Sequence, residues 1–233
     1  MSVLKLTDVH AYYGKSHILQ GVSLEVGDGE LVGILGRNGV GKTTLLKSIM
    51  GLVPPRAGSV VFDGEELSRL PAYRIPRLGI GYVPQGRHIF PTLTVRENLR
   101  IGLVKGGNSD EEQAFAQVFA NFPALRARLR QLGGTLSGGE QQMLAISRAL
   151  LGNPKLIMLD EPLEGLMPAM VAMVRDTAKR ICEMGVSVVL VEQNVKMALG
   201  VVHRVYILQK GAVTFAGRAQ DCTAEVLLQH LGV

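Results

Sequence analysis

The sequence has no tryptophan, few aromatic residues and only two cysteines, and each shortage argues against a class of protein. Aromatic residues make up 5% of the 233 residues, too few for the stacking platforms that bind single-stranded nucleic acid. Cys182 and Cys222 cannot form a disulfide framework, so we expect a reducing, cytoplasmic compartment. The start, MSVLKLTDVH, lacks the apolar core of a signal peptide. No apolar run approaches the ~20 residues that span a bilayer, so any membrane association is expected to be peripheral.

The composition is otherwise that of a chain with a substantial core. Hydrophobic residues make up 47% of the sequence and charged residues 19%, so the chain can bury one core, or one core with a lobe. Lys and Arg number 25 against 20 Asp and Glu, which gives a formal charge of +5 and a pI near 9.4. This balance suits anionic partners such as nucleotides, nucleic acid or a lipid surface, and charge alone does not choose among them.

The apolar pattern divides the chain into three parts. The first part is strand-like with tight turns, which predicts an antiparallel layer beside a main sheet. The pattern then becomes helical, which predicts a lobe over 86–151, with a surface loop at 105–109. After the lobe, strand and helix alternate as in a parallel α/β sheet, ending in a hairpin through Lys210-Gly211. We expect strands at 3–9, 18–26, 31–35, 59–62, 155–159 and 186–191, and helices at 44–50, 111–122, 139–150 and 168–184.

The most specific local pattern is a glycine-rich loop between a predicted strand and a predicted helix. It follows the apolar run 31–35 and fits G-x-x-x-x-G-K-[ST]. Glycines let backbone N–H groups turn toward phosphates, and the following helix adds its positive end. Lys42 is expected to reach the terminal phosphates, and the Thr43 hydroxyl to bind Mg²⁺. The predicted phosphate cradle comprises Gly36, Arg37, Asn38, Gly39, Val40, Gly41, Lys42, Thr43 and Thr44.

Two acids, Asp160 and Glu161, follow a later apolar run, 156–159. In a parallel sheet this places them at the carboxyl edge of the strands, where the cradle opens. Asp160 is expected to hold Mg²⁺ through water, and Glu161 to accept a proton from the water that attacks the γ-phosphate. Two acids after a strand are by themselves usually a solvated turn. The cradle at the same edge is what favours the catalytic interpretation.

A third motif, LSGGEQQ at 136–142, opens the predicted helix 139–150. By itself this serine is a helix N-cap. Together with the cradle and the acidic pair, the motif resembles the signature of ABC-type ATPases, and the resemblance covers essentially the whole chain. It implies an α/β fold in one domain over 1–233: a P-loop ATPase core with a mixed, mainly parallel sheet, an antiparallel β layer and an inserted helical lobe. It also implies a head-to-tail dimer, in which the γ-phosphate of the ATP in one cradle is contacted from the other subunit by Ser137, Gly138, Gly139 and Glu140.

The resemblance assigns roles to further residues. Gln85 is similar to the family's coupling glutamine, which meets Mg²⁺ or the attacking water and lies beside the surface that receives a membrane subunit. Tyr13 is similar to the aromatic residue on which adenine stacks, with Tyr12 as its competitor. The candidates for contact with a membrane subunit are Arg87, His88, Ile89 and Phe90, of which Ile89 and Phe90 are alternatively core residues of the lobe.

The sequence departs from the family pattern at two positions. Gln193 stands where many members have a histidine that orients the γ-phosphate and the attacking water. An amide donates a hydrogen bond but cannot carry the imidazole's charge, so we expect slower turnover than at a histidine-bearing site. Met167 stands where the family usually has an aspartate, so communication across the dimer is expected to differ.

The departures narrow the resemblance. The phrases PQGRHIFPTLTVRENL, LSGGEQQMLAI, DEPLEGLMP and, above all, LVEQN resemble one of the two ATPases of branched-chain amino acid importers, with the urea-importer ATPase a near neighbour. The resemblance implies ATP and Mg²⁺ as cofactors, and a peripheral position on the cytoplasmic face of the inner membrane. The implied partners are a second ATPase subunit, identical or different, two transmembrane subunits and, indirectly, a solute-binding protein, with no nucleic acid. The alternative is a slowly hydrolysing, nucleotide-gated dimerisation module. An ABC ATPase acting on DNA or ribosomes would need a long insertion or a second cassette.

Overall fold

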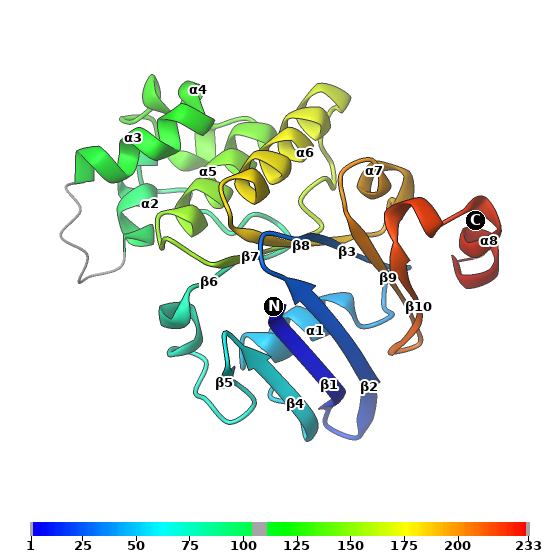
Figure 1. The fold of residues 1–233 in the computed structure, drawn as a ribbon. Coiled ribbons are helices and arrows are strands. Elements are labelled where there is room, and N and C mark those ends of the chain that lie inside the picture. The colour runs from blue at the N-terminus through cyan, green and yellow to red at the C-terminus, as the bar shows by residue number, and fades with distance from the viewer. Residues whose placement is uncertain (1, 104–110, 232–233) are drawn as a thin grey trace.

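A computed structural model describes residues 2–103 and 111–231 of the chain. Its centre is a six-stranded sheet with the strand order β10-β9-β3-β8-β7-β6 (Figure 1). All neighbours in this sheet pair in parallel except β10, which pairs antiparallel with β9. The expected mixed, mainly parallel sheet is therefore confirmed. Its strands are β3 (Leu31–Leu35), β6 (Ile80–Val83), β7 (Leu156–Asp160), β8 (Ser187–Glu192), β9 (Arg204–Gln209) and β10 (Ala212–Arg218).

The expected antiparallel layer is a second sheet with the order β2-β1-β4-β5. Its long strands, β1 (Ser2–Tyr13) and β2 (Ser16–Gly27), form a hairpin that turns at Gly14, and β4 (Ala57–Phe62) and β5 (Glu65–Glu66) extend the sheet on the other side of β1. Helix α1 (Lys42–Ile49) packs its buried leucines into the core that joins the two sheets.

The central sheet is covered on both faces because its strands are apolar on both faces. In β3, Leu31 and Leu35 belong to one core, whereas Val32 and Ile34 belong to the other. This alternation follows from the period of two in a strand, and burial of both faces is typical of parallel sheets. The antiparallel sheet covers one face, and helices α2 to α6 lie on the opposite side (Figure 1).

The segment expected as a helical lobe contains α2 (Val95–Gly102), α3 (Glu111–Asn121), α4 (Pro123–Arg126), the 3₁₀ turn η2 (Gly133–Thr135) and α5 (Gly138–Leu150). Its apolar side chains join the core under α6 (Pro168–Glu183). The surface loop predicted at 105–109 lies outside the described residues. The remaining helical elements are η1 (Ile75–Leu78), α7 (Val195–Leu199), η3 (Ala219–Asp221) and α8 (Ala224–Leu231).

The topology gathers the predicted motifs at one edge of the central sheet. The cradle follows β3, the acids end β7, Gln85 follows β6 and Gln193 follows β8, and parallel strands bring their carboxyl ends to the same edge. Among the described residues, no helix is long and apolar enough to cross a membrane.

Candidate functional site

The backbone conformation of the cradle requires glycine at two positions, Gly36 and Gly41. A Cβ on Gly36 would lie 2.6 Å from the carbonyl oxygen of Leu208, and Gly41 has φ +109°, a conformation that side-chain-bearing residues rarely adopt. Gly41 is also the N-cap of α1, and its carbonyl accepts the N–H of Leu45 at 2.8 Å. Helix α1 therefore starts two residues earlier than predicted, and Lys42 and Thr43 lie in its first turn.

Lys42 is buried at the centre of the site, with 4% of its surface exposed. Its ammonium donates to the carbonyl oxygens of Gly36 at 2.8 Å and Arg37 at 3.0 Å, and it lies 3.0 Å from Oε1 of Glu161. A buried ammonium needs such partners because desolvation of an unpaired charge is costly. The cradle and the acid predicted to be catalytic are thus joined through one lysine.

Thr43 and Asp160 are also brought together. The Thr43 hydroxyl donates to Oδ1 of Asp160 and the Tyr82 hydroxyl donates to Oδ2, both at 3.2 Å. Burial raises the pKa of the Asp160 carboxyl above its ordinary value, against the opposing effect of these two hydrogen bonds. Burial, and then the nearby Asp160, raise the pKa of the Tyr82 hydroxyl, so Tyr82 remains a donor.

The donors present fit Mg²⁺, which prefers oxygen ligands and is usually bound through one or two carboxylates together with substrate phosphates. A hydroxyl and a carboxylate oxygen lie side by side at the first turn of α1. No group of three or more His, Cys, Asp or Glu side chains in 2–103 and 111–231 forms a metal site of its own. An ion at Thr43 and Asp160 would therefore complete its coordination with phosphate, water and an amide oxygen such as that of Gln85.

Glu161 has an unusual backbone, with φ +47°. Its carboxylate accepts from Nε2 of Gln85 at 3.1 Å, and Nε2 also donates to Oε2 of Glu164 at 2.9 Å. Because carboxylates only accept, these two bonds fix the orientation of the Gln85 amide and leave its carbonyl oxygen for another partner. Gln85 and Glu161 line a hollow of about 420 Å³ together with Ile18, Asn38, Gly39, Gly41, Lys42, Thr43 and Thr44.

Tyr12 and Tyr13 differ in what their rings contact. The Tyr12 ring stacks on His17 with the centroids 4.2 Å apart, and the Arg56 guanidinium lies 4.6 Å from its centroid. The Tyr13 side chain is 48% exposed beside the hairpin turn. Tyr13 is thus the more open ring, and its contact with adenine stays a prediction because it does not line the hollow.

The signature residues lie at the start of α5 and do not line the hollow of their own chain. Ser137 caps the helix: its hydroxyl accepts the N–H of Glu140, whose carboxylate accepts the N–H of Ser137 at 2.8 Å and lies 2.8 Å from Arg128. The Arg87 side chain packs against Gly138, and the Met170 side chain packs so closely against buried Gly139 that a Cβ there would overlap its Cε. Their separation from the cradle leaves the predicted contact with a partner's nucleotide untested.

Gln193 follows β8, the strand that lies between β3, which precedes the cradle, and β7, which precedes Glu161. It is exposed and lines a second hollow, of about 870 Å³, together with Glu161 and Glu164. Met167, in the loop between β7 and α6, is 72% exposed. The structure therefore brings Gln193 to the acid but not into the phosphate hollow.

Sequence reasoning missed three residues that contact the site: Tyr82, Glu164 and Glu192. Tyr82 lies inside a four-residue strand whose neighbours are apolar, so nothing in the pattern shows that its hydroxyl reaches Asp160. Glu164 lies three residues after Glu161 in the same turn, so its closeness in the sequence to the acidic pair could have identified it as a site residue. Glu192, the last residue of β8, accepts the N–H of Leu163 at 3.0 Å.

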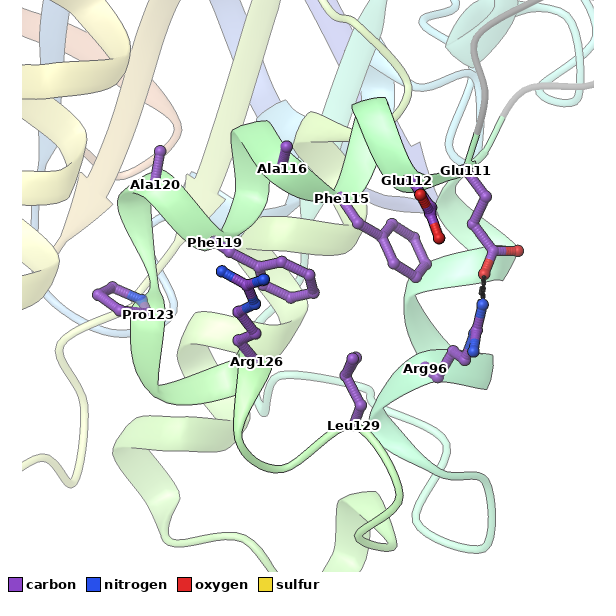
Figure 2. Close-up of a pocket in the computed structure, with 10 residues that line it drawn as sticks. All are labelled: Arg96, Glu111, Glu112, Phe115, Ala116, Phe119, Ala120, Pro123, Arg126 and Leu129. Carbon is purple, nitrogen blue, oxygen red and sulfur yellow. Dashed lines mark hydrogen bonds and ion pairs between the residues drawn. The ribbon is translucent and has the colours of Figure 1, made fainter.

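A separate groove of about 650 Å³ lies within the described part of the helical lobe. Figure 2 shows its wall formed by α3, with the rings of Phe115 and Phe119 turned into it, and Arg96 paired with Glu111 at one end. The two rings pack edge to face with their centroids 5.9 Å apart. The groove is thus apolar along its length and charged at the rim.

Comparison with known proteins agrees with this geometry. The family described as ABC transporter matches residues 19–164, which is more than half of the chain. The chain is 44% identical over 211 residues to the high-affinity branched-chain amino acid transport ATP-binding protein BraG of Pseudomonas aeruginosa, covering 91% of each chain. It is 36% identical over 214 residues to the lipopolysaccharide export system ATP-binding protein LptB of Escherichia coli strain K12, covering 91% of this chain and 88% of that one.

A solved dimeric ATP-binding cassette in a post-hydrolysis state, bound to ADP and phosphate, superposes with a TM-score of 0.81. It is 28% identical, and the match covers 93% of this chain and 98% of that one. The expected fold and the expected ATPase activity are therefore confirmed at the level of the family. The chain belongs to the ABC transporter family, as one of its ATP-hydrolysing cassettes.

Proposed function

We propose that this chain is the ATP-hydrolysing subunit of an importer for branched-chain or related amino acids. The observation that carries the proposal is the 44% identity to a branched-chain amino acid transport subunit over 91% of both chains, against 36% to the lipopolysaccharide export subunit. A urea or amide importer remains the alternative substrate assignment. In this role the chain lies on the cytoplasmic face of the membrane and binds two transmembrane subunits. A solute-binding protein delivers the solute to those subunits.

Binding of ATP follows from the cradle. The backbone N–H groups of 36–44 and the positive end of α1 hold the phosphates, Lys42 donates to the terminal phosphates, and the Tyr13 ring stacks on adenine. Thr43, Asp160 and Gln85 would hold Mg²⁺, which when bound neutralises phosphate charge. The contact between Thr43 and Asp160 and the shared hollow of Gln85 and Glu161 support this assignment.

Hydrolysis follows from Glu161. Its carboxylate lies beside Lys42, so it can accept a proton from a water placed in line with the γ-phosphate. Gln193 donates a hydrogen bond to the phosphate or the water from the side of the second hollow. Ser137, Gly138, Gly139 and Glu140 of this chain contact the γ-phosphate of the ATP held by the second ATPase subunit, so each subunit forms half of each site.

The lobe is the part we assign to the membrane subunits. Its groove offers an apolar floor at Phe115 and Phe119 within a charged rim, which suits an amphipathic segment of a partner. Phe90 is 45% exposed and stacks against Arg148, which supports its place in the same contact. Binding of ATP closes the dimer and the lobe passes the movement to the partner.

The test is a mild-detergent pull-down of the tagged chain from native membranes, with mass spectrometry of the retained proteins. Recovery of two multi-span proteins and a sister ATPase, with uptake of a branched-chain amino acid by the reconstituted complex, would support the proposal. Recovery of lipopolysaccharide export components, or of no membrane protein, would contradict it. A Glu161→Gln variant with an ATP-bound dimer lifetime equal to that of the unchanged chain would favour the nucleotide-gated module instead.

A further inference from the structure

The backbone of Glu161 requires support from its neighbours. A φ of +47° in a residue other than glycine costs on the order of 1–3 kcal/mol and persists only where surrounding contacts hold it. Within the turn the N–H of Glu164 donates to the carbonyl oxygen of Glu161 at 3.3 Å, and two further contacts come from the neighbouring strand β8. The N–H of Glu161 donates to the carbonyl oxygen of Val191 at 2.9 Å, and the N–H of Leu163 donates to Oε1 of Glu192 at 3.0 Å.

Both contacts come from the last two residues of β8, but only the second uses a side chain. Glu192 is 4% exposed, and burial of a carboxylate costs free energy unless hydrogen bonds compensate it. Burial raises the pKa of Glu192 to about 7, and the nearby charge of Glu161 adds to the rise. The N–H groups of Leu163 and Gln193, and the charge of Lys42, oppose it. The proposed mechanism of hydrolysis assigns no role to Glu192, although burial of its carboxylate costs free energy.

We propose that Glu192 is a positioning residue for ATP hydrolysis. Its carboxylate holds the N–H of Leu163, which fixes the turn after β7 and keeps the Glu161 carboxylate beside Lys42. Glu192 does not line the phosphate hollow, and it lines the second hollow together with Glu161 and Gln193. In this proposal it therefore acts through Glu161 and not on the nucleotide. The inference rests on the proposed role of Glu161 as the proton acceptor, and the test separates the two.

Two substitutions isolate the hydrogen bond. Glu192→Gln keeps an oxygen acceptor for Leu163, whereas Glu192→Met keeps the length of the side chain and removes the acceptor. We expect Glu192→Met to lower kcat about 10- to 100-fold, since a misplacement of about 1 Å costs roughly that much, and to leave KM for ATP within about twofold. Glu192→Gln should retain most of kcat. Equal losses in the two variants, or a raised KM with kcat unchanged, would overturn the proposal.

The matched control is Ser187→Ala, at the other end of the same strand. Ser187 is buried too, and at the opposite end of the strand from the cradle its hydroxyl accepts the N–H of Gly29 and donates to the carbonyl oxygen of Gly27. It should lower the melting temperature without changing kcat. Where Glu192→Met does not fold, Glu192→Ala takes its place in the comparison with Glu192→Gln, and fluorescent ATP binding reports that the cradle is intact.

A double-mutant cycle with Glu161→Gln separates the inference from the function on which it rests. Single-turnover hydrolysis should fall in Glu161→Gln and fall no further when Glu192→Met is added, because the second residue acts through the first. Undiminished hydrolysis in Glu161→Gln alone would contradict the proton-acceptor role. A further loss in the double variant as large as that in the wild-type background would contradict only the positioning role.

Discussion

At the residue scale, the site is built from buried charges that compensate one another. Lys42 pairs with Glu161, Asp160 receives two hydroxyl donors, and Glu192 receives a backbone N–H. Such sets are costly to bury and strongly destabilising to break, because removing one partner leaves the other charge unpaired. A substitution at this site should therefore preserve the hydrogen-bond acceptor or the shape of the side chain, so that its effect reports on chemistry and not on folding.

Glu192 should make stability depend on pH. Its pKa rises from 4.5 to about 7 on folding, so between these pH values the native protein binds more protons than the unfolded chain, and its stability falls as the pH rises. Glu192→Gln removes this titration. Near pH 4 the two proteins should be similarly stable, and above about pH 7 the variant should gain up to roughly 3 kcal/mol. Urea unfolding across this range measures the difference, and a difference that does not change with pH would contradict the prediction.

Gln193 should limit the rate of hydrolysis. It lines the second hollow beside Glu161, and an amide there donates a hydrogen bond without the charge of an imidazole. We expect Gln193→His to raise the maximal rate several-fold, with KM for ATP little changed, in a steady-state phosphate-release assay. Gln209→His, at the exposed end of β9 and outside the lining of both hollows, is the control and should have no such effect. An unchanged rate in Gln193→His would show that the amide is not limiting.

The sequence predicted the cradle and the acidic pair, because their chemistry requires fixed residue types at fixed spacing. It did not predict Glu192, because β8 is buried on both faces and lacks the apolar alternation that assigns a side to each residue. It did not predict Tyr82, because nothing in the short edge strand β6 shows that the hydroxyl reaches Asp160. For the adenine contact, the sequence reduced the candidates to two neighbouring tyrosines, Tyr12 and Tyr13. Only packing distinguishes them, since His17 and Arg56 cover Tyr12.

At the element scale, most of the helices and strands given predicted bounds lie within two residues of those bounds, and the small offsets matter. The predicted strands 155–159 and 186–191 are β7 (Leu156–Asp160) and β8 (Ser187–Glu192). The ladder thus continues one residue further into the polar end than hydropathy indicates, which places Asp160 and Glu192 on rigid strands. A prediction from hydropathy places the end of a strand at its last apolar residue, whereas the actual end is set by the last hydrogen bond to the neighbouring strand.

The capping boxes of α2 and α5 provide a matched pair for separating stability from function. Thr94 and Ser137 each cap a helix with a glutamate three residues on, and loss of either cap should cost about 1 kcal/mol. We expect Thr94→Ala and Ser137→Ala to lower the free energy of unfolding by similar amounts in urea titrations. Only Ser137→Ala should also lower ATP hydrolysis, since only Ser137 is proposed to reach the partner's nucleotide. Equal hydrolysis in the two variants would contradict the role of Ser137.

At the scale of the whole molecule, the nucleotide hollow and the lobe groove are separate. The hollow lies at the carboxyl edge of the central sheet, and the groove lies among α2, α3 and α4. Gln85 stands between them in the chain, after β6 and before the lobe. On the proposed function, a change in the groove is therefore expected to affect transport without altering the chemistry of the hollow, because the two share no lining residue.

Ala116 tests this separation. It is exposed on α3 and belongs to the lining of the groove, so Ala116→Asp adds a charge to that lining without disturbing the core. We expect the purified variant to bind and hydrolyse ATP normally, and the pull-down from membranes to lose the transmembrane subunits, with loss of amino acid uptake. Gln117→Asp, next on the same helix and outside the groove lining, should keep both. Because a charge in an apolar contact must be desolvated when the partner binds, uptake unaffected by Ala116→Asp would exclude this groove as the docking surface.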